Sequence, residues 1–197
     1  MAISGLIIAG GRATRMGGVD KGLVLLQQKS LIQHVLDRLT PQISEILINA
    51  NREIKQYEAL GYPVLQDETS DFIGPLAGFN LGLKHAKYDY LLTVPCDSPL
   101  LPLDLVERLL SSLLKHNAEI AFATSDADAH PVFCLCKESV LPSLTNYLQQ
   151  GGRKVSAWQK SLNYVEVDFT DNAEAFINLN TLKDLAALEL QLKYSYE

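Results

Sequence analysis

Residues 9–22 read AGGRATRMGGVDKG and directly follow the short apolar run 3–8. Glycines let the backbone approach a ligand closely, and successive exposed N–H groups form an anion-binding concavity. Arg12, Arg15 and Lys21 add cationic side chains to the same segment. A triphosphate needs both kinds of donor, so the stretch predicts a phosphate-binding loop after a buried strand. The alternative is a glycine-rich surface turn.

Two widespread phosphate loops do not fit this segment. The dinucleotide pattern GxGxxG is absent, since the segment begins Gly10-Gly11-Arg12. The Walker A pattern GxxxxGK[ST] fails as well, because Lys21 does not directly follow Gly17 and is itself followed by Gly22. The segment therefore predicts a third kind of phosphate loop.

Working outward from the loop, apolar strand-like runs alternate with helical patterns. This alternation predicts βαβ units, and continuous apolar strands fit a sheet that is covered on both faces. We expect one α/β domain over residues 1–197, with a three-layer α/β/α architecture and a mostly parallel, Rossmann-like sheet. The expected strands are 3–8, 45–49, 64–65, 90–94, 120–123, 132–136 and 164–169, and the expected helices are 30–39, 74–86, 103–115, 138–149 and 181–192.

In such a sheet, ligands bind beyond the carboxyl ends of the strands. The residues that follow the early strands are Ala9-Gly10-Gly11, Asn49, Asp67 and Asp97. A carboxylate at Asp97 suits a hard cation with oxygen ligands, such as Mg²⁺. Such an ion would neutralise charge on a leaving pyrophosphate. The alternative for Asp97 is the N-cap of the following helix.

The overall composition disfavours several classes of binding partner. A formal net charge of −6 and a pI near 5.2 disfavour a nucleic-acid partner, which requires a basic face. No apolar stretch approaches the about 20 residues that span a bilayer, and the N-terminus lacks the features of a secretory signal. The odd count of 3 cysteines fits a reducing compartment. We expect a cytoplasmic protein without a nucleic-acid or membrane partner.

The loop resembles the signature of nucleotidyltransferases with a GT-A-like, Rossmann-related fold. Its second half, RMGGVDKG, is similar to that of the molybdenum cofactor guanylyltransferase family, and the resemblance extends over nearly the whole chain. It implies that GMP passes from GTP to the terminal phosphate of molybdenum-bound molybdopterin, giving a guanine dinucleotide cofactor and pyrophosphate. Further matching motifs are NANR at 49–52, GPLAG at 74–78, PCDSP at 95–99 and NLNT at 178–181.

The resemblance also implies roles for single residues. The N-terminal part would bind the nucleotide and the C-terminal part the molybdopterin. Catalysis would involve Lys21, Arg15 and Asp97, and Asp97 would hold Mg²⁺. The residues implied for GTP are Ile8, Ala9, Gly10, Gly11, Lys21, Asn49, Asp67 and Asp97; those implied for the second substrate are Gly78, Asn178 and Asn180.

Simpler interpretations stand beside these roles. Lys21 offers a point charge and Arg15 a planar fork for phosphate, but both residue types are commonly solvated surface charges. Asp67 offers two acceptors to guanine N1–H and N2–H₂, which adenine cannot match; it and Asn49 are also common turn residues. Asn180, or the next residue, is suited to cap the last helix.

Cys134-x-Cys136 with His130 raises the possibility of zinc. A second close pair of ligands is missing and the segment alternates like a strand, so we favour a structural interpretation.

Three rival functions remain. One is cytidylyl transfer to molybdopterin or to a sugar or polyol phosphate. Another is a nucleotide-binding module without turnover, and a third, redox chemistry, is disfavoured because no CxxC occurs. We expect a monomer, and the resemblance implies transient contacts with molybdenum-insertion proteins or apo-molybdoenzymes.

Overall fold

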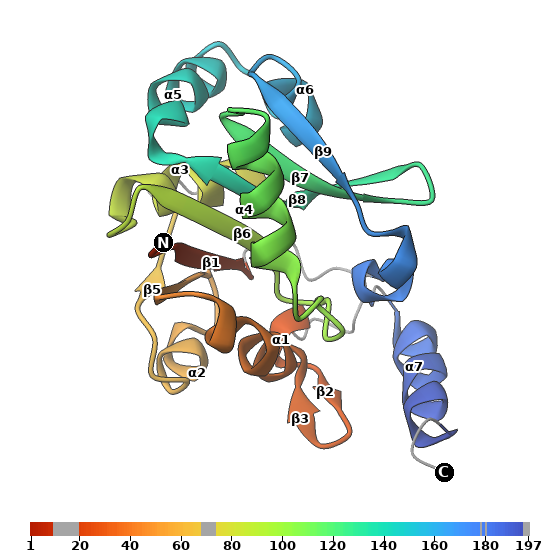
Figure 1. The fold of residues 1–197 in the computed structure, drawn as a ribbon. Coiled ribbons are helices and arrows are strands. Elements are labelled where there is room, and N and C mark those ends of the chain that lie inside the picture. Colours follow the sequence, from red (N-terminus) through yellow and green to blue (C-terminus); the bar gives the residue numbers. More distant parts are fainter. Residues whose placement is uncertain (10–19, 68–73, 178, 180, 195–197) are drawn as a thin grey trace.

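The computed structural model describes residues 1–9, 20–67, 74–177, 179 and 181–194 (Figure 1). Its centre is a seven-stranded sheet in the order β5-β4-β1-β6-β8-β7-β9. A separate two-stranded ribbon joins β2 to β3. The strands are β1 (Ser4–Ile8), β2 (Leu25–Leu26), β3 (Lys29–Ser30), β4 (Glu45–Asn49), β5 (Val64–Leu65), β6 (Tyr90–Pro95), β7 (Ile120–Ser125), β8 (Asp128–Lys137) and β9 (Tyr164–Asp168).

Most strand pairings are parallel, as the sequence predicted. Strands β5, β4, β1 and β6 run parallel to one another, and β9 runs parallel to β7. Within the seven-stranded sheet, β8 runs antiparallel to β6 and β7, and in the separate ribbon β2 runs antiparallel to β3. Strand β8 is joined to β7 by a tight turn in which Asp126 and Ala127 have φ of 48° and 69°. Two positive φ values suit a hairpin turn, but the absence of glycine there hid it from sequence analysis.

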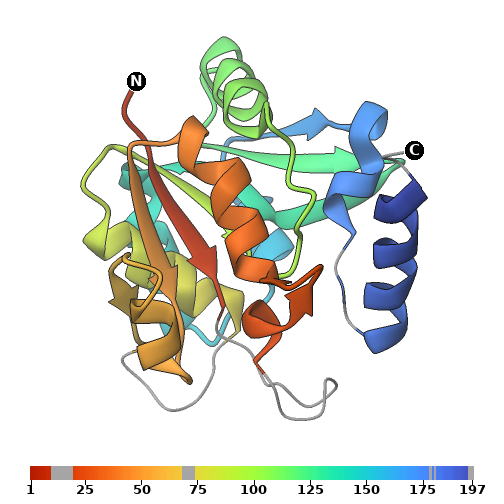
Figure 2. The same ribbon diagram turned by 90° about the horizontal axis from the view of Figure 1, so that it is seen from below.

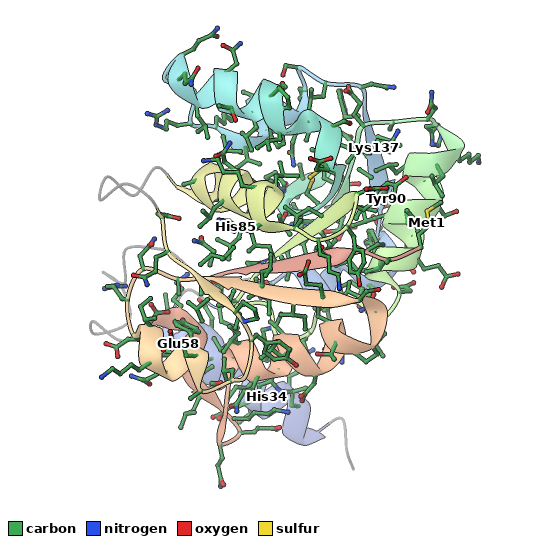
Figure 3. All side chains as sticks on the ribbon, turned by 90° about the vertical axis from the view of Figure 1, so that its left-hand side faces the viewer. Met1, His34, Glu58, His85, Tyr90 and Lys137 are labelled. Atoms are coloured by element: carbon green, nitrogen blue, oxygen red, sulfur yellow. The ribbon has the colours of Figure 1, made fainter. Side chains whose placement is uncertain are left out.

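Helices cover both faces of the sheet, which confirms the three-layer architecture. Helices α1, α2 and α4 share one buried cluster with Ile7 and Ile48, whereas α3, α5 and α6 share the other with Leu6 and Leu47. Alternate residues of one strand thus enter opposite layers, and side chains fill both (Figure 3). The helices are α1 (Leu31–Leu39), α2 (Ile54–Glu58), α3 (Pro75–His85), α4 (Leu105–Lys115), α5 (Leu141–Gln149), α6 (Val155–Gln159) and α7 (Leu182–Tyr194).

Local capping explains where several helices begin. Ser30 and Gln33 form the expected capping box at the start of α1. At α7, the hydrogen bonds of Thr181 and Asp184 are reciprocal: Thr181 N–H donates to the Asp184 carboxylate at 2.8 Å, and Asp184 N–H donates to Thr181 Oγ1 at 3.1 Å. Thr181, one of the two expected caps, therefore begins this helix, which lies at the periphery of the domain (Figures 1 and 2).

The two edges of the sheet at which strands begin and end can be told apart in the figures. In Figure 2 the arrowheads of β1 and β4 point to the same edge. The opposite edge is marked in Figure 3 by Tyr90, the first residue of β6, and by Lys137, its register partner at the end of β8.

Among the described helices, none combines the length and apolar content needed to cross a membrane.

Candidate active site

The carboxyl ends of the central strands bring several predicted residues together. Ile8, the last residue of β1, is in register with Asn49 of β4 on one side and with Pro95 of β6 on the other. Ala9 N–H donates to the Asn49 carbonyl at 2.8 Å, which continues the ladder one residue beyond β1. Asp97 follows Pro95 by two residues. The parallel sheet thus gathers at one edge the residues expected there.

Lys21 and Asp97 form an ion pair at this edge. Lys21 Nζ lies 3.0 Å from Asp97 Oδ2, and the two side chains are 30% and 12% exposed. A pair that is partly withdrawn from water is screened less than a surface pair. Asp97 is in the turn after β6 rather than at the start of a helix, since α4 is preceded by Asp104. The N-cap interpretation of Asp97 is therefore wrong.

Asn49, Asn51 and Asp67 form a second polar cluster. Asn49 Nδ2 donates to Asp67 Oδ1 at 2.9 Å, and Asn51 Nδ2 donates to Asp67 Oδ2 at 2.8 Å. Asp67 N–H in turn donates to Asn51 Oδ1 at 2.8 Å. The two amides fix the plane of the carboxylate, which remains partly exposed. Asn51 belongs to the NANR motif at 49–52, but no role was predicted for it from the sequence.

Gly78 can lie close to this cluster because it has no side chain. A Cβ atom at Gly78 would lie 2.7 Å from Asn49 Oδ1, closer than real Cβ contacts allow. Glycine at this position lets α3 approach the end of β4. The structure therefore gives Gly78 a packing role beside Asn49, in addition to its expected role in substrate binding.

Several predicted residues lie outside the described part of the chain: Gly10, Gly11, Arg12, Arg15, Asn178 and Asn180. Leu179, between the two asparagines, is described. Its N–H donates to the Asp97 carbonyl at 3.3 Å, and its side chain, 1% exposed, packs with Leu26, Leu31 and Leu188. The C-terminal segment is thereby attached to the turn that follows β6.

A buried aspartate precedes Lys21, and sequence analysis did not single it out. Asp20 is 5% exposed, and its Oδ1 accepts hydrogen bonds from Tyr57 Oη and from Gly22 N–H, the latter at 3.3 Å. Arg52 Nη2 lies 3.9 Å from Asp20 Oδ2. The available signal was an aspartate beside the lysine of a phosphate loop, but its partner on α2 is 37 residues away.

The cysteines and His130 do not form a metal site. Cys134 and Cys136 are buried in the apolar cluster beneath α3, α5 and α6, and burial raises the pKa of Cys136 to about 12. Ser125 Oγ lies 2.6 Å from His130 Nε2, and the His130 ring stacks on Phe176. Within the described ranges, no group of three or more His, Cys, Asp or Glu side chains is arranged to hold a metal ion. The structural interpretation of these residues fits this arrangement.

The donor set nevertheless suits a magnesium ion that arrives with a nucleotide. Magnesium retains water and uses one or two carboxylates together with substrate phosphates, rather than a cage made wholly of protein. Asp97 supplies one carboxylate at the sheet edge, with the cationic Lys21 beside it. The site thus fits Mg²⁺ that is carried by a triphosphate better than a resident metal.

Comparison with known proteins shows the family to which the chain belongs. The model of the MobA-like NTP transferase domain matches residues 5–163. A molybdenum cofactor guanylyltransferase from Polynucleobacter asymbioticus is 51% identical over 96% of this chain and 97% of its own. One from Bordetella petrii is 50% identical over 94% and 96%. The chain belongs to the molybdenum cofactor guanylyltransferase family. Its members are nucleotidyltransferases, and this chain is one of them.

A solved structure supports the fold of this family member. It is the molybdopterin-guanine dinucleotide biosynthesis protein A from Archaeoglobus fulgidus, with a TM-score of 0.79 and 24% sequence identity. The match covers 97% of this chain and 99% of that chain. The expected Rossmann-like nucleotidyltransferase fold is confirmed.

Proposed function

We propose that this protein transfers GMP from GTP to the terminal phosphate of molybdenum-bound molybdopterin, forming molybdopterin guanine dinucleotide and releasing pyrophosphate. The observation that carries the proposal is the Lys21–Asp97 ion pair, which lies at the same sheet edge as the Asn49–Asp67 cluster. One cluster offers charge to a triphosphate, and the other offers polar groups to a base. Family membership supplies the substrates.

On the phosphate side, Lys21 would donate to phosphate oxygens while Asp97 would hold Mg²⁺. When bound, the metal supplies neutralisation of charge on the triphosphate and the leaving pyrophosphate. Lys21 contributes a strongly hydrated point charge that is already partly withdrawn from water. Arg15 is proposed to contact a phosphate farther from the sheet, and the backbone of Ile8, Ala9, Gly10 and Gly11 to approach the nucleotide.

On the base side, Asp67 would accept hydrogen bonds from guanine N1–H and N2–H₂. Each carboxylate oxygen has two lone pairs, and the asparagines occupy one on each. Acceptor capacity therefore remains for a base. Because Asn49 and Asn51 already hold the carboxylate plane, little orientational freedom would be lost on binding.

The acceptor substrate is proposed to lie on the C-terminal side of the same edge. Asn178 and Asn180 would contact the pterin, in keeping with the attachment of Leu179 to Asp97. Gly78, in the first half of α3, lies beside Asn49 of the base-side cluster, so an acceptor group that meets Gly78 would lie close to the nucleotide.

The reaction is an in-line displacement. A phosphate oxygen of molybdopterin forms a bond to the α-phosphorus of GTP as the bond between that phosphorus and the β-phosphate oxygen breaks. The attacking phosphate is ionised near neutral pH, so no strong general base is required. Catalysis then consists mainly of positioning and charge neutralisation.

The wider setting of the reaction is part of the proposal. We propose that the protein is a single domain and acts as a monomer. We also propose that it works in the cytoplasm, in keeping with the free, buried state of Cys96, Cys134 and Cys136. Transient contacts with molybdenum-insertion proteins or apo-molybdoenzymes would pass on the labile cofactor.

The test is product formation from defined components. The protein is mixed with molybdenum-bound molybdopterin, Mg²⁺ and GTP labelled at the α-phosphate, with CTP, ATP or UTP as competitors. We expect label in a pterin dinucleotide, stoichiometric pyrophosphate, and weak competition by the other nucleotides. Preferred use of CTP would establish the cytidylyl rival, and binding without pyrophosphate release would establish a non-catalytic module.

A further inference from the structure

Asp20 is a buried carboxylate with polar groups around it. It is 5% exposed and lies between Tyr57 of α2, the backbone of Gly22 and the guanidinium of Arg52. Burying a carboxylate costs free energy unless it is well hydrogen-bonded, and apolar groups would fill the same volume more cheaply. A carboxylate held in this way calls for an explanation beyond packing.

Tyr57 is the partner that reaches Asp20 from farthest along the chain. Its side chain is fully buried, and its hydroxyl donates to Asp20 Oδ1. Burial, reinforced by the nearby Cys96 and Asp20, raises the pKa of Tyr57 far above its ordinary value. The hydroxyl therefore stays protonated near neutral pH, as a donor to Asp20 must.

Gly22 makes room for this contact. A Cβ atom at Gly22 would lie 2.7 Å from Tyr57 Oη and 3.2 Å from Cys96 Sγ. Glycine lets the chain after Lys21 pass closely between α2 and the end of β6. The family-like motif DKG at 20–22 thus carries two residues that serve the Tyr57 contact, one on each side of the lysine.

The backbone that carries Lys21 is fixed from both sides. Asp20 is the N-cap of the short 3-10 helix η1 (Lys21–Leu23), accepting from Gly22 N–H through its side chain and from Leu23 N–H, at 3.0 Å, through its carbonyl. Lysine has several rotatable bonds, so only a fixed backbone can direct its ammonium reproducibly. That ammonium reaches Asp97 at 3.0 Å.

From this geometry we propose that Tyr57, acting through Asp20, is a positioning residue that aims Lys21 at the triphosphate. The proposal rests on the proposed function, because it presumes that Lys21 contacts the nucleotide. It also connects the two halves of the nucleotide site. Arg52, which lies 3.9 Å from Asp20, belongs to the same NANR segment as the asparagines that hold Asp67.

The test begins with Tyr57→Phe, which removes one hydroxyl and keeps the ring. The matched control is Tyr147→Phe, which also removes one hydroxyl bond, from Tyr147 Oη to the Lys154 carbonyl at 3.2 Å, in the layer on the other face of the sheet. We expect kcat/KM for GTP to fall about tenfold in Tyr57→Phe, as for loss of a hydrogen bond to a charged group. Tyr147→Phe should retain normal activity.

A double-mutant cycle separates positioning from a general structural effect. In a Lys21→Ala background, Tyr57→Phe should lower kcat/KM less than twofold, because the residue that it aims is gone. Wild-type kinetics for Tyr57→Phe, or the same fold loss in both backgrounds, would overturn the inference. Full activity of Lys21→Ala alone would instead count against the proposed function, so the two failures are distinguishable.

Discussion

Lys21 Nζ lies 3.0 Å from Asp97 Oδ2, although 76 residues separate them along the chain. This ion pair connects the last part of the glycine-rich segment 9–22 to the turn after β6. In this pair the ammonium and the carboxylate neutralise each other. With a metal-bound triphosphate, we expect each to exchange that contact for the ligand, the ammonium for phosphate and the carboxylate for metal.

Removal of the carboxylate in Asp97→Ala should lower kcat about 100-fold or more, if its electrostatic role is typical. The matched control is Asp89→Ala, an exposed aspartate just before β6, at the opposite edge of the sheet. Steady-state pyrophosphate release at saturating GTP measures both variants. Near-normal turnover of Asp97→Ala would remove this residue from the mechanism.

Asp67→Asn should weaken the preference for GTP over ATP. The substitution replaces an acceptor with an amide whose NH₂ cannot accept from guanine N1–H or N2–H₂, so we expect the ratio of kcat/KM values to fall about tenfold. Measuring both nucleotides on one preparation cancels any loss of folded protein. If the ratio stays at the wild-type value, Asp67 does not recognise the base.

Gly78→Ala should disturb the nucleotide site through packing. The added Cβ would lie 2.7 Å from Asn49 Oδ1, so Asn49, whose Nδ2 donates to Asp67, must shift. We expect a severalfold higher KM for GTP and a stability loss of about 1 kcal/mol, as for modest overpacking. Kinetics and denaturant unfolding measure the two effects. An unchanged KM would show that Asn49 can shift without consequence for the nucleotide.

His130 should make stability depend on pH. Burial lowers the pKa of His130, with Asp128 opposing the shift, so the unfolded chain binds this proton more readily than the folded protein. Stability is therefore lost as the pH falls below the ordinary histidine value of about 6.5. His130→Phe, which can still stack on Phe176, should lose less stability on that fall than the wild type. Urea unfolding near pH 7 and near pH 5 measures the stability of both proteins. If the wild type and His130→Phe lose the same stability between these pH values, the account is contradicted.

Much of the fold could be predicted because it follows from local patterns. The capping box of Ser30 and Gln33 begins α1, and EILIN at 45–49 forms β4 with the predicted bounds. Because ligand-binding residues lie beyond the carboxyl ends of parallel strands, Asn49, Asp67 and Asp97 could be predicted to lie at one edge of the sheet. These predictions need only periodicity, capping chemistry and the parallel arrangement of the strands.

The remaining features depend on contacts that no local pattern encodes. Helix α2 is five residues long, too short to show a clear helical period, so Tyr57 gave no sign that it reaches Asp20. Asn51 gains its role only when β4 and β5 lie side by side, which brings it to the Asp67 carboxylate. Tertiary pairing, rather than residue type, selects these two side chains.

The central claim is that the edge carrying Lys21 and Asp97 holds magnesium-bound GTP. The most direct measurement is a thermal-shift panel of GTP, CTP, ATP and UTP, with and without Mg²⁺, on the wild type, Lys21→Ala and Asp97→Ala. A ligand that binds only the folded state raises the apparent Tm. We predict the largest shift with GTP and Mg²⁺ in the wild type, a much smaller one in Lys21→Ala, and no Mg²⁺-dependent part in Asp97→Ala. Equal shifts in all three proteins, or a larger shift with another nucleotide, would contradict the account.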